Sequence, residues 1–310
     1  MRSEAQLART SKAQIAAALA QNRMARCGIR LLILNPAMQT IKLGVLTVNR
    51  LGFGAMRVCG PQIWGPPKDR PGALRVLRRA YELGHNFFDT ADSYGPEVDE
   101  TLIAEALHPY PKDLVVATKG GLVRPRPSAW DSDARPEHLR RALEGSLKRL
   151  KLERIDLYQL HAPDPKVPFA DSVGALAEMQ RAGKIRHIGV SNVSVRQLEE
   201  ARRIAPIVSV QNEYNLEDRS SEDVLKACEK HAIAFLPWYP LGAGSALRSS
   251  KVRTVSKKTG HTPAQVLLAW LLAHSAAMLP IPGTGSLAHL EENSAATRLK
   301  LDSEDLKALQ

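Results

Sequence analysis

Three titratable side chains lie at the ends of short apolar runs of the sequence. Asp89 and Tyr94 come at and just after the end of one such run, and Lys119 closes the next. A tyrosine has an ordinary pKa of about 10, so a tyrosine that must donate a proton at neutral pH needs a cation beside it. Lys119 is available as that cation, and Asp89 is available to keep the lysine charged and in place. The three residues therefore predict a proton-donating active site.

A fourth polar residue, His161, ends a later apolar run. Each of the four has an ordinary structural interpretation when taken alone. Tyr94 would be a packed loop aromatic, Lys119 a solvated strand end, Asp89 a cap for the amides that follow it, and His161 a hydrogen-bonded core histidine. In a closed barrel of parallel strands, however, the strand ends converge on one mouth, which favours a shared site.

Strand-like apolar runs alternate with longer helical patterns from residue 40 onward, which is typical of a parallel sheet built from βα units. The predicted strands are 51–56, 86–90, 114–119, 155–161, 185–191, 207–212, 234–239 and 277–282. The predicted helices are 73–83, 97–107, 136–150, 172–182, 195–204, 221–231, 262–274 and 287–296. Eight strands predict the α/β class and a (β/α)8 TIM barrel, with an N-terminal β-hairpin at 40–50 that plugs its floor. A doubly wound sheet is disfavoured because no G-x-G-x-x-G follows the first strand.

The length of 310 residues and the 44% hydrophobic composition suit one large core, so we expect a single barrel domain at residues 38–310. Residues 1–37 are rich in Arg, Ser and Ala and contain a single acid, and we expect a disordered N-terminal extension there. That segment fits either a targeting peptide or a misassigned start.

The formal charge of +11 does not predict nucleic-acid binding. Residues 1–37 hold six Lys or Arg and one acid, which leaves +6 for the rest, where the basic residues are spread along helices. Three cysteines that are far apart predict neither a disulfide framework nor a metal site. Because no apolar run approaches a membrane span, we expect a cytoplasmic protein without a membrane or nucleic-acid partner.

Several motifs in this order resemble the aldo-keto reductases, a family of NAD(P)H-dependent carbonyl reductases on a (β/α)8 barrel. The resemblance covers about residues 40–310 and is closest to a bacterial, pyridoxal-reductase-like branch. The motifs are Phe88-Asp89-Thr90-Ala91, Tyr94-Gly95, Ala117-Thr118-Lys119, Gln159-Leu160-His161, Gly189-Val190-Ser191-Asn192, Gln211-Asn212-Glu213-Tyr214, Pro240-Leu241-Gly242 and Ile281-Pro282-Gly283-Thr284. The resemblance implies that Asp89, Tyr94, Lys119 and His161 form a catalytic tetrad.

The implied reaction is hydride transfer to a substrate carbonyl carbon, with Tyr94 donating a proton to the carbonyl oxygen. Lys119 would make the phenol more acidic, and His161 would orient the same oxygen. The product would be an alcohol. The chain is thus expected to be an NADP-dependent aldo-keto reductase acting on small-molecule aldehydes or ketones.

The resemblance also implies a set of cofactor-binding residues. Ser191, Asn192 and Gln211 would hold the nicotinamide amide, and Trp238 would offer its ring face to the nicotinamide. The diphosphate would follow Leu241, Gly242 and Gly244, where glycines allow close approach of phosphate oxygens. The remaining candidates lie beyond the eighth strand and are Gly283, Thr284, Ser286, His289, Glu292 and Asn293.

One departure from the family pattern concerns the phosphate of NADP. Many relatives carry Lys or Arg where this chain has Gly283 and His289. The resemblance implies NADPH, with Thr284, Ser286 and His289 as contacts, and the missing basic clamp leaves NADH as the alternative.

Substrate selection is expected from the loops around the mouth. Trp64 and Trp130 are candidate pocket walls, or else loop anchors, whereas Tyr239 is expected to face away from Trp238 on a regular strand. We expect a monomer or weak homo-oligomer. Two other functions stay open. One is a cofactor-binding regulatory subunit related to potassium-channel β subunits, and the other, a metal-dependent hydrolase, is disfavoured by the sparse His and carboxylate pattern.

Overall fold

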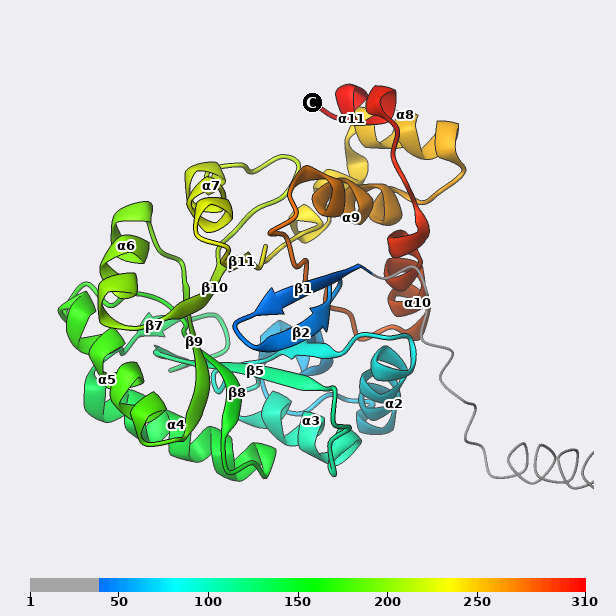
Figure 1. The fold of residues 1–310 in the computed structure, drawn as a ribbon. Coiled ribbons are helices and arrows are strands. Elements are labelled where there is room, and N and C mark those ends of the chain that lie inside the picture. The colour runs from blue at the N-terminus through cyan, green and yellow to red at the C-terminus, as the bar shows by residue number, and fades with distance from the viewer. Residues whose placement is uncertain (1–38) are drawn as a thin grey trace, which may run out of the picture. The chain divides into compact units, whose positions relative to one another are not determined.

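The computed structural model describes residues 39–310, and the prediction of a disordered extension at 1–37 lies outside them. Element labels are those of Figure 1. The strands are β1 (Thr40–Leu43), β2 (Leu46–Asn49), β3 (Phe53–Gly54), β4 (Phe87–Asp89), β5 (Val115–Gly120), β6 (Leu122–Val123), β7 (Asp131–Ser132), β8 (Ile155–Leu160), β9 (Ile185–Ser191), β10 (Ile207–Gln211) and β11 (Ala234–Phe235). The α-helices are α2 (Arg70–Glu82), α3 (Val98–Leu107), α4 (Pro136–Leu150), α5 (Phe169–Arg181), α6 (Val195–Ile204), α7 (Glu222–Lys230), α8 (Ser250–Thr259), α9 (Pro263–His274), α10 (Leu287–Ala295) and α11 (Ser303–Ala308).

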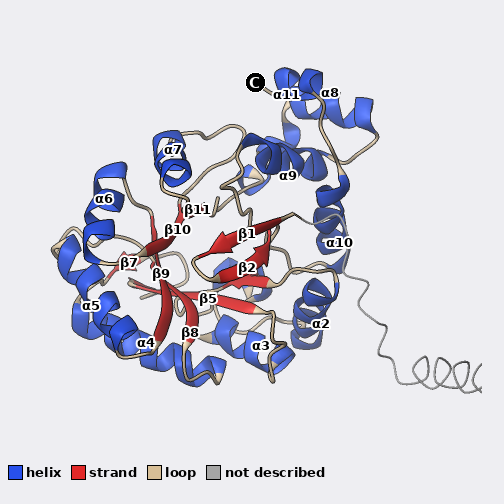
Figure 2. Cartoon of the chain, in the orientation of Figure 1, coloured by secondary structure: helices blue, strands red, loops and turns tan. Residues whose placement is uncertain are grey.

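A parallel sheet forms the centre of the molecule, and the helices surround it (Figure 2). Its strands are hydrogen-bonded in the order β11, β10, β9, β8, β5, β4, β3. The eighth predicted strand, 277–282, is not a regular strand but fills the gap between β11 and β3. The Leu279 amide donates to the Phe235 carbonyl at 2.8 Å, and the Gly52 amide donates to the Pro280 carbonyl at 2.9 Å. The sheet is therefore a closed eight-membered barrel, as predicted.

Prolines explain why two predicted strands are irregular. Pro280 and Pro282 have no amide hydrogen, so the segment accepts bonds from β3 but cannot return them. Because Pro282 has no amide hydrogen, the Gly52 carbonyl receives no hydrogen bond from this segment. It contacts Nδ1 of the buried His85 ring at 3.2 Å instead. In the same way Pro237 cannot donate the bond that would continue β11 toward Leu279, so β11 ends at Phe235 rather than at residue 239.

The hairpin of β1 and β2 closes the floor of the barrel. Leu43 and Val48 are fully buried and pack with Phe87, Leu157 and other inward-facing residues of the strands. Gly44 turns the hairpin with a φ of 59°, and a Cβ at this position would lie 2.3 Å from the His187 ring. Only glycine fits there without movement, so the turn of the hairpin packs closely against His187.

Local signals in the sequence set most helix boundaries. Thr262, the first residue of the predicted helix 262–274, caps α9 by accepting from the Gln265 amide, and Gly183 follows α5 with a φ of 79°. Ser172 was expected to start a helix but lies inside α5, where its hydroxyl donates to the Ala134 carbonyl at 2.8 Å. The apolar faces of these helices pack on the outside of the sheet.

Helices α8 and α11 are additions to the predicted set. Only Val252 and Val255 of α8 are buried, so this helix lacks the apolar stripe that would have revealed it.

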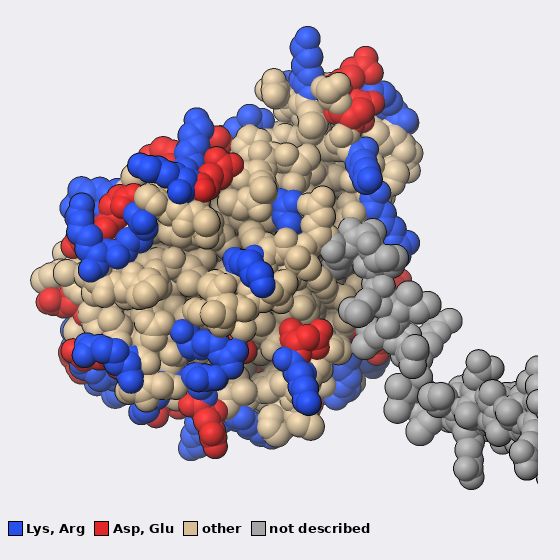
Figure 3. Space-filling model, in the orientation of Figure 1, with Lys and Arg blue, Asp and Glu red and all other residues tan. Residues whose placement is uncertain are grey.

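On the face seen in Figure 3, acidic and basic residues alternate around the rim instead of forming a patch of one sign. Among residues 39–310 we find no helix with both the length and the apolar character needed to cross a membrane.

Candidate active site

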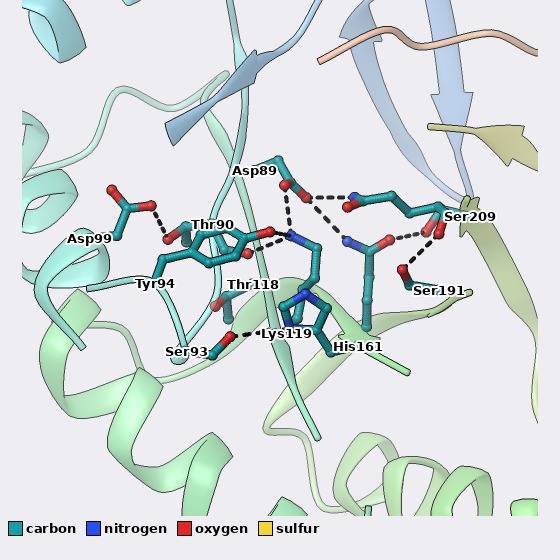
Figure 4. Close-up of polar contacts among 12 residues, drawn as sticks. Asp89, Thr90, Ser93, Tyr94, Asp99, Thr118, Lys119, His161, Ser191 and Ser209 are labelled. Atoms are coloured by element: carbon teal, nitrogen blue, oxygen red, sulfur yellow. Dashed lines mark hydrogen bonds and ion pairs between the residues drawn. The ribbon is translucent and has the colours of Figure 1, made fainter. Parts of the chain in front are cut away.

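The parallel strands deliver the predicted polar residues to the open end of the barrel. Asp89 is the last residue of β4, Lys119 is the last but one of β5, and His161 directly follows β8. Tyr94 lies in the loop after β4, where its amide donates to the Ala91 carbonyl and its carbonyl accepts from the first turn of α3. Figure 4 shows the side chains of Asp89, Tyr94, Lys119 and His161 pointing toward one another.

Lys119 is the centre of the group. Its Nζ donates to Asp89 Oδ2 at 2.7 Å, to the Thr90 carbonyl at 2.8 Å and to the Tyr94 hydroxyl at 3.3 Å. The side chain is fully buried, and these three acceptors account for the three donors of an ammonium group. The lysine is therefore fixed in place with its charge directed at the phenol oxygen.

Asp89 has partners on both carboxylate oxygens. Oδ2 accepts from Lys119, while Oδ1 accepts from Gln211 Nε2 at 2.8 Å and from Gln159 Nε2 at 3.3 Å. Hydrogen bonds to the ionised form stabilise a buried carboxylate. The network of Asp89 thus links β4, β5, β8 and β10 beneath the open end of the barrel.

The Tyr94 hydroxyl is a protonated group at neutral pH. Burial raises its pKa well above the ordinary value, and the negative charges of Asp89 and Asp99 raise it further. The neighbouring ammonium of Lys119 favours the phenolate and acts in the opposite direction. The phenol therefore carries a proton that it can donate. Tyr94 is 6% exposed and lines the cavity, so a bound molecule can reach it.

His161 is a neutral imidazole in this environment. Burial lowers its pKa well below the ordinary value, and the charge of Lys119 lowers it further. Its Nδ1 contacts Ser93 Oγ at 3.4 Å, and its ring packs edge-on against Tyr94 with a centroid distance of 5.7 Å. A neutral imidazole beside the phenol can donate one hydrogen bond to a bound oxygen.

A second layer of buried carboxyl groups lies behind the four residues and was not predicted. Asp99 Oδ2 accepts from Thr90 Oγ1 at 2.8 Å, and burial raises the pKa of Asp99 to about 7. Glu100 accepts from Arg149 Nε at 2.7 Å and from Thr118. Both acids occupy the first turn of α3, and an acidic pair so close to a catalytic motif is the signal that could have identified them.

A cavity of about 360 Å³ opens above these groups. Its walls include eleven predicted residues, namely Asp89, Tyr94, His161, Ser191, Asn192, Gln211, Trp238, Leu241, Gly244, Gly283 and Trp130. Lys119 is not in the lining because it lies behind Asp89 and Tyr94. Arg57, Met56, Leu122 and Leu247 also line the cavity and were missed. Arg57 lies in a 3-10 turn after β3 and just beyond the predicted strand 51–56, so strand alternation gave no direction for its side chain.

The polar residues at the ends of β9 and β10 contact one another. Ser191 Oγ donates to the Gln211 carbonyl at 2.7 Å, and Asn192 Nδ2 donates to the His161 carbonyl at 2.9 Å. Trp238 Nε1 donates to Asn192 Oδ1 at 3.0 Å, which fixes the indole ring. In the described part of the chain Gln211 Oε1 has no hydrogen-bond partner, so this acceptor is free to bind an amide.

The other predicted cofactor residues lie in two segments next to the cavity, one at residues 241–244 and one at residues 283–293. Gly242 has a φ of 57° and stands between two lining residues without lining the cavity itself. Thr284 Oγ1 accepts from the Ser286 amide at 3.0 Å, and Ser286 caps α10 by accepting from the His289 amide. His289, Glu292 and Asn293 are on α10 outside the cavity lining. An anion can be held at such a helix N-terminus.

The aromatic residues of the mouth depart from the predictions in two places. Trp130 lines the cavity, whereas Trp64 does not, and the centroid of the Trp64 ring lies 5.6 Å from the Arg124 guanidinium. Tyr239 was expected to face away but lines the cavity next to Trp238. Its φ of 50° breaks the strand alternation on which that expectation rested.

The donor set fits a nicotinamide dinucleotide better than a metal. Within residues 39–310 no three His, Cys, Asp or Glu side chains are placed to hold a metal ion. The cavity instead combines amide groups, an indole face and glycine-containing turns, and it extends toward the start of α10. Gly283 lies so close to the neighbouring strand β3 that a Cβ at this position would lie 2.4 Å from the Gly54 carbonyl oxygen, so this part of the wall requires glycine.

Comparisons with known proteins identify the family of the chain. The model of the aldo/keto reductase family matches residues 50–310. A protein of Escherichia coli (strain K12) named pyridoxine 4-dehydrogenase is 45% identical over 276 residues, which cover 87% of this chain and 96% of that protein. The thermostable aldo-keto reductase Tm1743, crystallised with the inhibitor epalrestat, is 35% identical with a TM-score of 0.77, and the match covers 88% of this chain and 98% of that one. An aldo-keto reductase of Klebsiella pneumoniae, crystallised with NADPH, is 27% identical with a TM-score of 0.75, and the match covers 88% and 94% of the two chains. The chain therefore belongs to the aldo/keto reductase family and is an oxidoreductase that acts on carbonyl groups.

Proposed function

We propose that the protein is an NADPH-dependent reductase whose substrates are aldehydes, with pyridoxal as the first candidate. The observation that carries this proposal is the placement of Lys119 Nζ between Asp89 and the Tyr94 hydroxyl, at 2.7 Å and 3.3 Å, at the base of the cavity. A phenol next to a buried ammonium is suited to give a proton to an oxygen that gains negative charge.

The proposed roles follow from the contacts of the four residues. The reduced nicotinamide, when bound, would supply the hydride to the carbonyl carbon. Tyr94 donates its hydroxyl proton to the carbonyl oxygen, and Lys119 stabilises the phenolate that is left. Asp89 holds the lysine in place and balances its charge. His161, neutral and adjacent to Tyr94, donates a hydrogen bond that orients the same oxygen.

The cofactor would be held by residues of the cavity and of its exit. Ser191, Asn192 and Gln211 would bind the carboxamide, and Trp238 would pack against the nicotinamide ring. Leu241, Gly242 and Gly244 would follow the diphosphate. The adenosine end would reach Gly283, Thr284, Ser286, His289, Glu292 and Asn293.

NADPH is proposed because a structural relative was crystallised with it and because Arg57 supplies a cation to the cavity wall beside Gly283. Arg57 has no ion-pair partner within residues 39–310, so its charge is available to a phosphate. The absence of Lys or Arg at Gly283 and His289 keeps NADH as the alternative cofactor.

Pyridoxal is proposed from the wall of the cavity and from the name of one relative. The Trp130 ring stands over Tyr94 and His161, and such a wall suits a flat aromatic aldehyde. The relative that is 45% identical is named pyridoxine 4-dehydrogenase, and reduction of the pyridoxal aldehyde gives pyridoxine.

The test is a panel of aldehydes and ketones, pyridoxal included, with either reduced cofactor. Oxidation of the cofactor would be followed by its absorbance, and the alcohol would be identified by chromatography. The Tyr94→Phe variant is the blank. The proposal predicts pyridoxine as a product, formed faster with NADPH than with NADH. Bound NADPH with no turnover of any carbonyl would instead support a regulatory subunit.

A further inference from the structure

Arg124 fastens two loops at the mouth of the cavity, although the proposed reaction does not use it. The residue follows β6 and is 8% exposed. Its Nε donates to the Ala129 carbonyl at 2.9 Å, and its Nη1 donates to the Ile63 carbonyl at 3.1 Å. Its Nη2 donates to the Gln62 carbonyl at 3.1 Å and to the Pro127 carbonyl. One guanidinium thus joins the loop after β3 to the loop between β6 and β7.

The charge of Arg124 is balanced by aromatic rings and carbonyls. In the described part of the chain it forms no ion pair with a carboxylate. Its guanidinium lies 3.8 Å from the Trp130 ring centroid and 5.6 Å from the Trp64 ring centroid. A cation over an indole face is attracted by the ring quadrupole, and the attraction increases where water is excluded. Arg124 therefore packs on one face of the Trp130 ring, and the residue also lines the cavity.

The loop after β3 is strained at the two residues that Arg124 binds. Gln62 has a φ of 58° and Ile63 a φ of 57°, both in the left-handed region. This conformation is unfavourable for a β-branched residue such as Ile63. Strain of this kind persists only where surrounding contacts impose it, and it concentrates at functional sites. The two hydrogen bonds from Arg124 are among the contacts that impose it here.

The same loop is bound to the neighbour of the proposed acid. The Ile63 carbonyl also accepts from the Gly95 amide at 3.3 Å, and the Gly65 amide donates to the Gly95 carbonyl at 2.8 Å. On the other side of Arg124, the Trp130 ring meets Tyr94 edge-on at 6.2 Å. Arg124 consequently fixes Trp130 in relation to Tyr94.

Trp130 also packs edge-on against His161, with a centroid distance of 6.4 Å. The indole therefore stands over both groups that would contact a carbonyl oxygen. Trp130 is 39% exposed, so part of its surface is not packed against the protein.

We propose that Arg124 is a positioning residue that sets substrate choice. It holds the Trp130 ring as a wall against which an aromatic aldehyde lies while its carbonyl oxygen reaches Tyr94 and His161. This inference rests on the proposed function. Lysine cannot replace Arg124, because an ammonium has no planar face for the indole and cannot reach carbonyls of both loops.

The kinetic test compares Arg124→Lys, Trp130→Phe and the double variant, with Arg126→Lys as the matched control. Arg126 is an exposed arginine of the same loop. We expect Arg124→Lys to raise KM for pyridoxal about tenfold and to change KM for propanal, which is too small to lie against Trp130, less than about twofold. The dissociation constant of NADPH should not change. In the Trp130→Phe background, Arg124→Lys should have no additional effect.

A second measurement needs no turnover. The contribution of Trp130 to acrylamide quenching of fluorescence is obtained as the difference between each protein and its Trp130→Phe counterpart. We expect Trp130 to become more accessible in Arg124→Lys and to stay unchanged in Arg126→Lys.

Two results would overturn the inference. One is unchanged quenching of Trp130, and the other is an equal rise of KM for both aldehydes that persists without Trp130. A wild-type protein that reduces no aldehyde would contradict the proposed function, and the quenching difference would still decide whether Arg124 holds the ring.

Discussion

Gln211 donates a 2.8 Å hydrogen bond to Asp89, although the two residues are 122 positions apart in the chain. The same Gln211 lines the cavity, and Asp89 holds Lys119. One amide side chain therefore touches both the group that orients the ammonium and the space proposed for the nicotinamide.

Replacement of Gln211 by alanine should affect cofactor and catalysis together. Asp89 Oδ1 would keep only the longer contact with Gln159, and the carboxamide would lose a partner. We expect the dissociation constant of NADPH to rise and kcat to fall, each by about tenfold, since one hydrogen bond to a charged group contributes about 1.5 to 3 kcal/mol. Fluorescence titration and steady-state rates measure the two effects. Gln180→Ala, on the outer helix α5, is the control, and a change in kcat alone would contradict the dual role.

The two directions of the reaction should differ in their dependence on pH. Burial and nearby carboxylates raise the pKa of Tyr94, so the phenol remains protonated through neutral pH. Aldehyde reduction requires the protonated form and should be nearly constant from pH 6 to about 8, whereas alcohol oxidation requires the phenolate and should accelerate as pH rises. Rates of single turnover in both directions check this. An oxidation rate that falls with rising pH would be inconsistent with Tyr94 as the proton carrier.

Asp99 should make the protein less stable as pH rises. Its pKa is raised from 3.8 to about 7 by burial, so between these values the unfolded chain loses the proton that the folded chain retains. The free energy of unfolding therefore falls across this window, by at most on the order of 4 kcal/mol, and is constant above it.

Asp99→Asn tests this because the amide oxygen can still accept from Thr90. In urea unfolding, the free energy of unfolding of the variant should increase relative to that of the wild type as pH rises from 4.5 to about 8. Glu153→Gln, at an exposed carboxyl, should follow the wild type. A stability difference that does not change with pH would exclude the titration of Asp99 as the cause.

Arg57 should contribute to the affinity for NADPH through its charge. The side chain is exposed on the cavity wall and has no ion-pair partner among residues 39–310. We expect Arg57→Ala to weaken NADPH binding about tenfold and to reduce the salt dependence of binding, because a charge-assisted bond to phosphate is lost. Isothermal titration at two ionic strengths provides the measurement. Arg196→Ala, on the remote helix α6, should bind NADPH like the wild type, and an equal effect in the two variants would refute a specific role.

The parts of the site that the sequence predicts are those fixed by strand direction. Asp89, Lys119 and His161 end parallel strands, and such ends converge whatever the loops do. Residues governed by irregular backbone could not be predicted in this way. Tyr239 enters the cavity through a positive φ, and Arg57 does so through a 3-10 turn.

The fold shows the same division between regular and irregular segments. The eight barrel segments and eight helices follow from periodicity, whereas Pro237, Pro280 and Pro282 change how the barrel closes. Helix α8 was missed because it buries little apolar surface. Arg124 hydrogen-bonds carbonyls of two loops that are distant in sequence, and hydrophobic periodicity does not predict such contacts.

The most direct test of the account is the rate of pyridoxal reduction by Tyr94→Phe in a single turnover with bound NADPH. Tyr81→Phe, which removes the hydroxyl of a half-buried tyrosine on α2 that donates to Asp113, is the matched control. We predict that Tyr94→Phe loses about 10² to 10⁴-fold in this rate while the dissociation constant of NADPH stays within about twofold. A rate like that of the wild type, or a loss explained by weaker NADPH binding, would contradict the assignment of Tyr94 as the proton donor.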